Sequence, residues 1–192
     1  NQLFLGLSGG AGAPKADAWL TLCHVGNAGL CYVDSVELDE LRQPLRVYER
    51  RFLPDTEGPG RTRGAPSLRV AYGPVNCSLD VAYVSDGVIN GARGVRGGGD
   101  GARVRQWVQS RNGDVQDAPN CGVVTLVDGE QIVCDTAAGG GYGPPMERDP
   151  QRVADDVRER WISIDHARTV YGVVLAADGS VDQAATRAVR AG

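Results

Sequence analysis

Glycine is concentrated in a few short segments of this chain. Four glycines fall within residues 139–143, and seven fall within residues 86–101. Glycine weakens helices and strands, and it adopts backbone conformations that other residues avoid. With 27 glycines in 192 residues and only 6% aromatic residues, the composition favours short strands and tight turns over a helical bundle.

Alternating or short apolar stretches predict β-strands across the first 145 residues. The clearest pattern lies in residues 44–75, where a strand around Val47 is followed by a turn-rich loop and a second strand at 67–73. The acidic run at 34–40 is interpreted as a solvated strand end and turn. Further strands are predicted at residues 2–7, in two pieces around a loop at 24–29 within 19–38, and at 77–85, 102–110, 123–127 and 130–137, the last two joined by a turn.

The hydrophobic period changes near residue 146. Asp149 followed by Pro150 is typical of a helix start, and apolar residues at four-residue spacing predict a helix over 150–161. The other predicted elements of this tail are a short helix that starts at Ser163, a hairpin with an Asp-Gly turn at 171–182, and a last helix at 182–191.

These patterns together predict an α+β fold with two parts. Residues 1–145 are expected to form a β-rich domain of short, mainly antiparallel strands with Gly-rich loops. Residues 146–192 are expected to form a small helical C-terminal tail with a short hairpin.

The composition argues against several classes of protein. A formal net charge of −4 and a pI near 5.2 speak against a nucleic-acid-binding surface, and no apolar run has the length of a membrane span. No segment has the pattern of a secretory signal. The five cysteines are odd in number and widely spaced, which argues against a zinc site or a disulfide framework. We therefore expect reduced thiols and a cytoplasmic location.

The Gly-rich loop before the first helix of the tail has the general shape of a phosphate-binding loop. A P-loop would also need a Lys and a Ser or Thr, but Pro144 and Pro145 follow here. A dinucleotide-binding loop would need a βαβ unit, which the upstream strands do not form. Two interpretations stay open: the glycines pass close to another backbone, or they line a site that another chain completes. The loop residues in this prediction are Gly139, Gly140, Gly141 and Tyr142.

Four other residues are candidates for the edge of such a cavity or an interface. His24 and Asn27 lie in an irregular Gly-containing loop. The alternative role for a lone His such as His24 is that of a packed structural residue. Arg61 and Arg63 are expected to face solvent or a partner subunit, and their guanidinium groups also suit a carboxylate or phosphate. His166 is interpreted as a surface or interhelical residue. No nucleophile–base pair and no metal-ligand motif can be assembled, so no catalytic residue is predicted.

Several motifs occur in one order along the chain. The Gly-rich turn at 139–143 precedes Glu147-Arg148-Asp149-Pro150, a helix, and Val170-Tyr171-Gly172-Val173-Val174. Upstream, segments 8–19, 23–27, 44–64 and 84–101 add further motifs. This set resembles the hydantoinase B/oxoprolinase family over nearly the whole chain. The sequence departs from the family pattern at three places: Gly26 replaces a usual Thr, Pro144 replaces a usual acidic residue, and residues 65–67 replace a Gly-rich stretch.

The resemblance implies a subunit of a multi-subunit ATP-dependent enzyme of the hydantoinase or oxoprolinase type, which hydrolyses a cyclic amide. B-type subunits of this family are much longer, and their metal-binding Asp and His residues lie in a part with no counterpart here. The chain is thus expected to be a split C-terminal portion, with no metal or cofactor and no activity of its own.

The resemblance also implies partners and cofactors. The expected partners are a hydantoinase A-like ATP-binding subunit and the N-terminal, metal-binding part of the B-type subunit. ATP, Mg and a divalent metal, Zn or Mn, are expected in those partners. Two alternatives stay open: a subunit of a ketone carboxylase of the acetone or acetophenone type, and a purely structural subunit that ties the other chains together.

Overall fold

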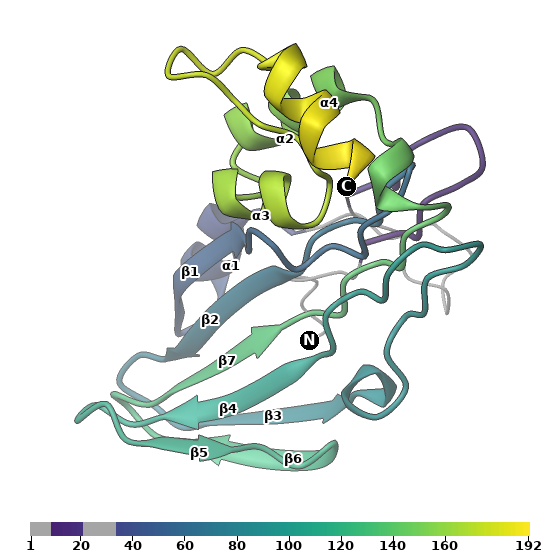
Figure 1. The fold of residues 1–192 in the computed structure, drawn as a ribbon. Coiled ribbons are helices and arrows are strands. Elements are labelled where there is room, and N and C mark those ends of the chain that lie inside the picture. Colours follow the sequence, from purple (N-terminus) through teal and green to yellow (C-terminus); the bar gives the residue numbers. More distant parts are fainter. Residues whose placement is uncertain (1–8, 21–33) are drawn as a thin grey trace.

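The computed structural model describes residues 9–20 and 34–192 (Figure 1). The strand predicted at 2–7 and most of the pair predicted within 19–38 lie outside the described residues. The described part has an α+β fold, as predicted. No helix within it has the length and apolar character needed to cross a membrane.

A five-stranded sheet forms the centre of the fold, with every pair of neighbouring strands antiparallel. Its order is β1 (Leu45–Phe52), β2 (Leu68–Pro74), β7 (Gln131–Asp135), β4 (Arg105–Gln109) and β5 (Val115–Asp117). A separate antiparallel ribbon consists of β3 (Leu79–Val84) and β6 (Cys121–Leu126). The strands predicted from residue 44 onward are therefore confirmed, but β5 was not predicted because it is only three residues long and fully exposed.

The sheet packs on both faces. Val70 and Ala71 are neighbours on β2, so their side chains point to opposite sides. Val70 joins a cluster with Leu68 that Val36 covers, whereas Ala71 packs with Trp107 and its neighbour on β7. With both faces covered, β2 is the most continuously buried of the described strands.

The prediction for the acidic run at 34–40 was wrong, because the chain forms helix α1 (Val36–Arg42) there. The Ser35 hydroxyl accepts a hydrogen bond from the Leu38 N–H at 3.4 Å and caps the helix. Glu37 and Asp39 lie in the first turn, where carboxylates stabilise the positive end of the helix dipole. The acidic residues thus favour a helix start over a strand end.

The connection between β6 and β7 also differs from the prediction. A tight turn joins them, but they do not pair with each other. β6 pairs with β3, and β7 lies between β2 and β4. Strand order is decided by contacts between distant segments, which a local turn motif does not encode.

The helical tail follows the prediction closely. It contains the 3₁₀ turn η3 (Pro145–Glu147), α2 (Pro150–Arg158), α3 (Ile164–Thr169) and α4 (Gln183–Ala191), and a second 3₁₀ turn, η2 (Asp86–Val88), lies in the body. α2 ends three residues early, since Arg160 has a φ of +63°. The predicted hairpin at 171–182 is reduced to one bridge, between Leu175 and Val181.

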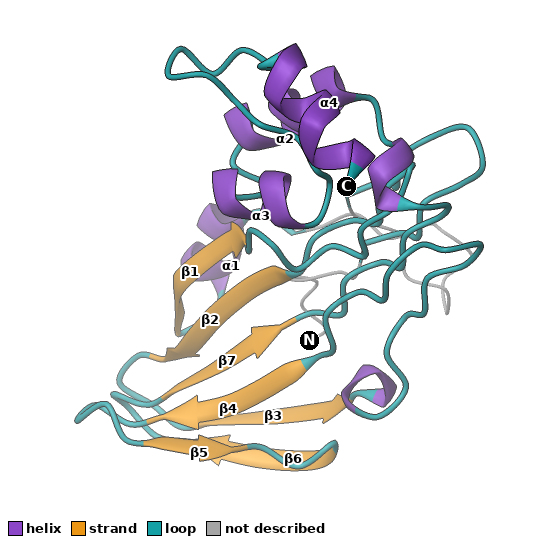
Figure 2. Ribbon diagram, viewed as in Figure 1, coloured by secondary structure: helices purple, strands orange, loops and turns teal. Residues whose placement is uncertain are grey.

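Helices α2, α3 and α4 gather on one side of the molecule (Figure 2). Their contact surface is a small apolar core of the tail. Its fully buried members are Val153, Ile162, Ala167, Tyr171 and Val173.

Helix α4 depends on its cap. The Asp182 carboxylate accepts hydrogen bonds from the Ala184 and Ala185 N–H groups at 3.0 and 2.9 Å. We predict that Asp182→Ala lowers the free energy of unfolding by about 1 kcal/mol, measured by urea denaturation. The exposed Gln183→Ala is the control and should change it by less than about 0.5 kcal/mol. Equal effects of the two substitutions would contradict a capping role.

Candidate functional site

Three glycine-rich segments leave the sheet at the same end. Residue 69 at the start of β2 and residue 105 at the start of β4 both pair with residue 135 at the end of β7. The loops that precede β2 and β4 and the loop that follows β7 therefore emerge side by side (Figure 2). Together with an N-terminal stretch they form a layer of backbone, which we call the glycine layer. It consists of residues 9–12, 58–64, 94–101 and 139–143.

The glycine layer is held by backbone contacts too close for side chains. A Cβ added to Gly139 would lie 1.7 Å from the Gly10 carbonyl oxygen, and one on Gly141 would lie 2.0 Å from the Pro59 carbonyl oxygen. A Cβ on Gly140 would lie 2.2 Å from the carbonyl oxygen of Arg93. The glycines of this loop thus allow the close passage of backbones, the first of the two interpretations.

Four of the five N–H groups of the Gly-rich turn, residues 139–143, already have partners. The N–H groups of residues 139, 141, 142 and 143 donate to backbone carbonyls at 2.9–3.0 Å, in the order Ala65, Gly99, Thr62 and Val95. A phosphate-binding loop instead directs several free N–H groups at its ligand. The geometry agrees with the exclusion of a P-loop made from the sequence.

Tyr142 and Arg61 lie at the open edge of the glycine layer. Tyr142 bridges two of its segments, through Thr62 and Val95. The Arg61 guanidinium carbon lies 5.7 Å from the centre of the Tyr142 ring, and Arg61 Nη1 lies 3.7 Å from a carboxylate oxygen of Glu147. The Arg61 side chain keeps 45% of its surface exposed. These two predicted residues are therefore neighbours and remain accessible.

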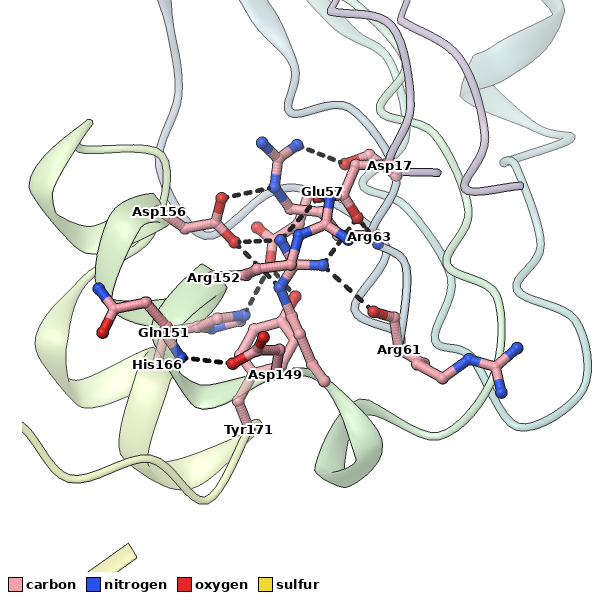
Figure 3. Close-up of polar contacts among 12 residues, drawn as sticks. Asp17, Glu57, Arg61, Arg63, Asp149, Gln151, Arg152, Asp156, His166 and Tyr171 are labelled. Carbon is pink, nitrogen blue, oxygen red and sulfur yellow. Dashed lines mark hydrogen bonds and ion pairs between the residues drawn. The ribbon is translucent and has the colours of Figure 1, made fainter. Parts of the chain in front are cut away.

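A network of buried charges joins the glycine layer to the helical tail (Figure 3). The Arg148 guanidinium, 1% exposed, donates to both Asp17 carboxylate oxygens at 2.7 and 2.8 Å. It also donates to Asp156 Oδ2, 3.1 Å from Nε and 2.8 Å from Nη2. Arg152, a half-exposed residue of α2, also donates to Asp17: its Nη2 lies 2.7 Å from Asp17 Oδ2.

Arg63 belongs to the same network, which corrects its prediction as a solvent-facing or interface residue. It is 2% exposed, and its Nε donates to Asp156 Oδ1 at 3.0 Å. Its guanidinium carbon lies 4.2 Å from the centre of the Trp161 ring. A buried Arg is stable here because a carboxylate, an aromatic face and the Gly64 carbonyl, 3.2 Å from Nη1, replace its water.

The network changes the ionisation of Asp17. Burial alone would raise the pKa of this carboxyl, but the hydrogen bonds and charge of Arg148 outweigh burial and hold its pKa below the usual value. Arg63 adds to this through its backbone N–H, which donates to Asp17 Oδ1 at 2.9 Å. Asp17 is consequently an ionised partner of Arg148 over the physiological pH range.

A second cluster ties α3 to the loop before the glycine layer, so His166 is more than a surface residue. Its Nε2 lies 3.0 Å from Glu57 Oε1, and the Tyr171 hydroxyl donates to the same oxygen at 2.9 Å. Its Nδ1 lies 3.8 Å from a carboxylate oxygen of Asp55. Glu57 is 3% exposed. The hydrogen bond to Glu57 raises the pKa of His166 above its ordinary value, against the opposing effect of burial.

This cluster makes stability depend on pH. Because the folded-state pKa of His166 is raised, its stabilising effect is full below the unfolded pKa of about 6.5 and disappears as the pH rises through the folded value.

We predict that Glu57→Gln lowers the pKa of His166, which is measured by NMR titration of its ring. Asp165→Asn is the control and should lower it less, since Asp165 acts only through its charge. An unchanged His166 pKa in Glu57→Gln would contradict the pairing.

The predicted site residues fall into three groups. Gly139, Gly140 and Gly141 form the centre of the glycine layer, while Tyr142 and Arg61 lie at its edge. Arg63 lies in the charge network. His24 and Asn27 lie outside the described residues. Four members of the charge network were not predicted as site residues: Asp17, Arg148, Arg152 and Asp156.

Comparison with known proteins identifies the class of this chain. The family model described as hydantoinase B/oxoprolinase matches residues 2–145. The chain therefore belongs to the hydantoinase B/oxoprolinase family, as its motifs indicate.

Individual relatives refine this picture. The chain is 30% identical to the beta subunit of caprolactamase from Pseudomonas jessenii over 190 residues, which is 95% of this chain and 32% of that protein. It is 27% identical to the acetone carboxylase alpha subunit of Xanthobacter autotrophicus over 196 residues, covering 81% of this chain and 25% of that protein. The crystal structure of the ATP-dependent caprolactamase from Pseudomonas jessenii superposes with a TM-score of 0.78 at 28% identity, over 97% of this chain and 33% of that chain. The chain thus spans about a third or less of the length of these relatives.

Proposed function

We propose that this chain is a subunit of a multi-subunit ATP-dependent enzyme that hydrolyses a cyclic amide. The observation that carries the proposal is its likeness to the ATP-dependent caprolactamase, which extends over 97% of the chain at a TM-score of 0.78. We further propose that it corresponds to the C-terminal portion of a B-type subunit.

The chemistry of this class explains why several subunits cooperate. An amide carbon is a poor electrophile, so the amide oxygen first takes the γ-phosphoryl group of ATP and ADP is released. Water then adds to the activated carbon, the ring C–N bond breaks, and phosphate leaves. The products are an amino acid, ADP and phosphate. Water must reach the activated carbon of this intermediate and no other atom, which requires a closed cavity with fixed walls.

The glycine layer suits the role of such a wall. Its backbone segments are joined by hydrogen bonds of 2.7–3.1 Å. Its central glycines leave no room for side chains. We propose that Tyr142 and Arg61, at its edge, face the catalytic part of the assembly, together with His24 and Asn27. Gly139, Gly140 and Gly141 support this edge from within.

ATP, Mg and a divalent metal, Zn or Mn, are proposed to lie in partner subunits. Among residues 9–20 and 34–192, no group of three or more His, Cys, Asp or Glu side chains has a geometry that could hold a metal ion. The residues described here therefore do not fit a resident metal. The proposed partners are a hydantoinase A-like ATP-binding subunit and the metal-binding N-terminal part of the B-type subunit.

A ketone carboxylase is the second candidate function, because the acetone carboxylase alpha subunit is also a relative over 81% of the chain. The reaction type can be tested on the assembly purified from its source. Native mass spectrometry with metal analysis should find this chain with larger subunits and a metal. ATP consumption is then compared with a lactam and with a ketone plus bicarbonate. Turnover of the lactam supports hydrolysis, turnover of the ketone supports carboxylation, and isolation of the chain alone contradicts a subunit role.

A structural role without contact to the substrate can be separated from a place at the cavity. Tyr142→Ala and Arg61→Gln should lower turnover while the assembly stays intact if these residues line the site. If every such variant that loses turnover also dissociates the subunits, the chain acts only as a scaffold.

A further inference from the structure

A small pocket lies beside the glycine layer, in the loop that leads into β4. Its volume is about 200 Å³. It opens between the segment around Arg93 and the segment around Arg103, and Asn90 and Asp100 also line it. The pocket is outside the charge network of Arg148 and serves no role described so far.

The two arginines supply positive charge without a partner. Both side chains are exposed, and within the described part of the chain neither guanidinium forms an ion pair or hydrogen bond. The two other polar side chains of the pocket each make a hydrogen bond within the protein. Asp100 Oδ1 accepts from the Gly94 N–H at 2.8 Å, and Asn90 Nδ2 donates to Asp86 Oδ1 at 2.7 Å. The pocket therefore presents two guanidinium groups against one carboxylate.

The walls of the pocket are fixed by backbone. The Gly101 N–H donates to the Ala92 carbonyl at 2.9 Å, which joins the two segments. The Arg93 carbonyl oxygen packs against Gly140, and it lies 2.2 Å from the position that a Cβ on Gly140 would occupy. Because Gly91 has no side chain, the aliphatic part of the Arg103 side chain packs beside it. The Arg103 Cγ lies 3.0 Å from the position that a Cβ on Gly91 would occupy. The Cα positions of the two arginines are thus held by the same contacts that build the glycine layer.

We propose that this pocket binds a small oxyanion, a carboxylate or a phosphoryl group, between Arg93 and Arg103. Guanidinium groups form paired hydrogen bonds with both anions. The volume lies below the roughly 300–1,000 Å³ of pockets for drug-sized ligands, so the ligand or the part of it that enters is small. A phosphoryl source would rest on the ATP-dependent function proposed above, whereas a carboxylate source would not.

The proposal is tested by titrating the full chain, labelled with ¹⁵N, with inorganic phosphate and separately with acetate. The amides of Gly91, Gly94 and Gly101 should shift in a saturable way with at least one of the two anions. Binding more than about tenfold tighter for phosphate, a difference of about 1.4 kcal/mol, identifies a phosphoryl site. The reverse preference identifies a carboxylate site. This measurement needs no turnover. Anion binding can therefore be absent while the proposed function holds, and it can be present while the proposed function fails.

Substitutions give the decisive comparison. Arg93→Gln combined with Arg103→Gln should weaken binding at least tenfold, while Arg96→Gln, in the same loop but outside the pocket, should leave it unchanged. Asp100→Asn keeps an acceptor for Gly94 and removes the opposing charge, so it should tighten binding. The absence of saturable shifts, or equal affinity in the double variant and the wild type, would overturn the proposal. Unchanged amide spectra of the variants without ligand establish that they are folded.

Discussion

Replacing Arg148 with Met should lower the free energy of unfolding by about 3–5 kcal/mol at pH 7. Arg148 is 1% exposed and bonds two carboxylates, those of Asp17 and Asp156. Met fills a similar volume but leaves both carboxylates buried with a single cationic partner each, Arg152 for one and Arg63 for the other. The cost is therefore that of two carboxylates that lose the hydrogen bonds and the charge of Arg148 in a largely buried place, rather than that of a cavity.

The pH dependence separates this explanation from a loss of packing. Without Arg148, both acids are freer to take up protons, and a neutral carboxyl is cheaper to bury. The cost of Arg148→Met should shrink between pH 7 and pH 4, measured by urea denaturation at each pH. Arg152→Met is the matched control, because that side chain is 45% exposed and its ion pair contributes about 1 kcal/mol or less. A loss below about 1 kcal/mol at pH 7, or a loss that is the same at both pH values, would contradict the buried-charge argument.

The helical tail was predictable because its signals are local. Asp149 accepts from the Gln151 N–H at 2.9 Å, and Ser163 accepts from the His166 N–H at 3.1 Å, as N-cap residues do. The register of the apolar face of α2 follows from the sequence. Asp156 lies on that face, three residues after the buried Val153, and a carboxylate in such a position is a signal of a buried ion pair.

The charge network itself was not predictable because its partners are far apart in the sequence. Arg63 and Asp156 are separated by 93 residues, and Arg148 and Asp17 by 131. Nothing in the local sequence of Arg63 distinguishes a buried guanidinium from an exposed one. The same limit applies to strand order, where β7 inserts between β2 and β4 instead of pairing with β6. The glycine clusters were a clear signal, but the segments that pack on them are set by that strand order.

Among the glycines of residues 9–20 and 34–192, Gly139 should be the one whose replacement with Ala is most damaging. The new Cβ would stand 1.7 Å from the Gly10 carbonyl oxygen and 2.5 Å from its carbon, and neither is the mobile end of a side chain. The two backbones must separate. Separation strains the hydrogen bonds that Gly139 makes on either side, its N–H with the Ala65 carbonyl at 2.9 Å and its carbonyl with the Gly58 N–H at 2.8 Å.

The expected loss is about 3 kcal/mol or more, the upper end of the range for overpacked interiors. It is measured as the free energy of unfolding in urea, or as loss of soluble protein if the variant does not fold. Gly113→Asn is the matched control. Gly113 has a φ of +89° and no atom within 4 Å of a Cβ, and Asn tolerates positive φ better than other residues. It should cost less than about 1 kcal/mol. A Gly139→Ala variant as stable as this control would show that the glycine layer is loose enough to admit side chains, and the rigid wall proposed for the cavity would fail with it.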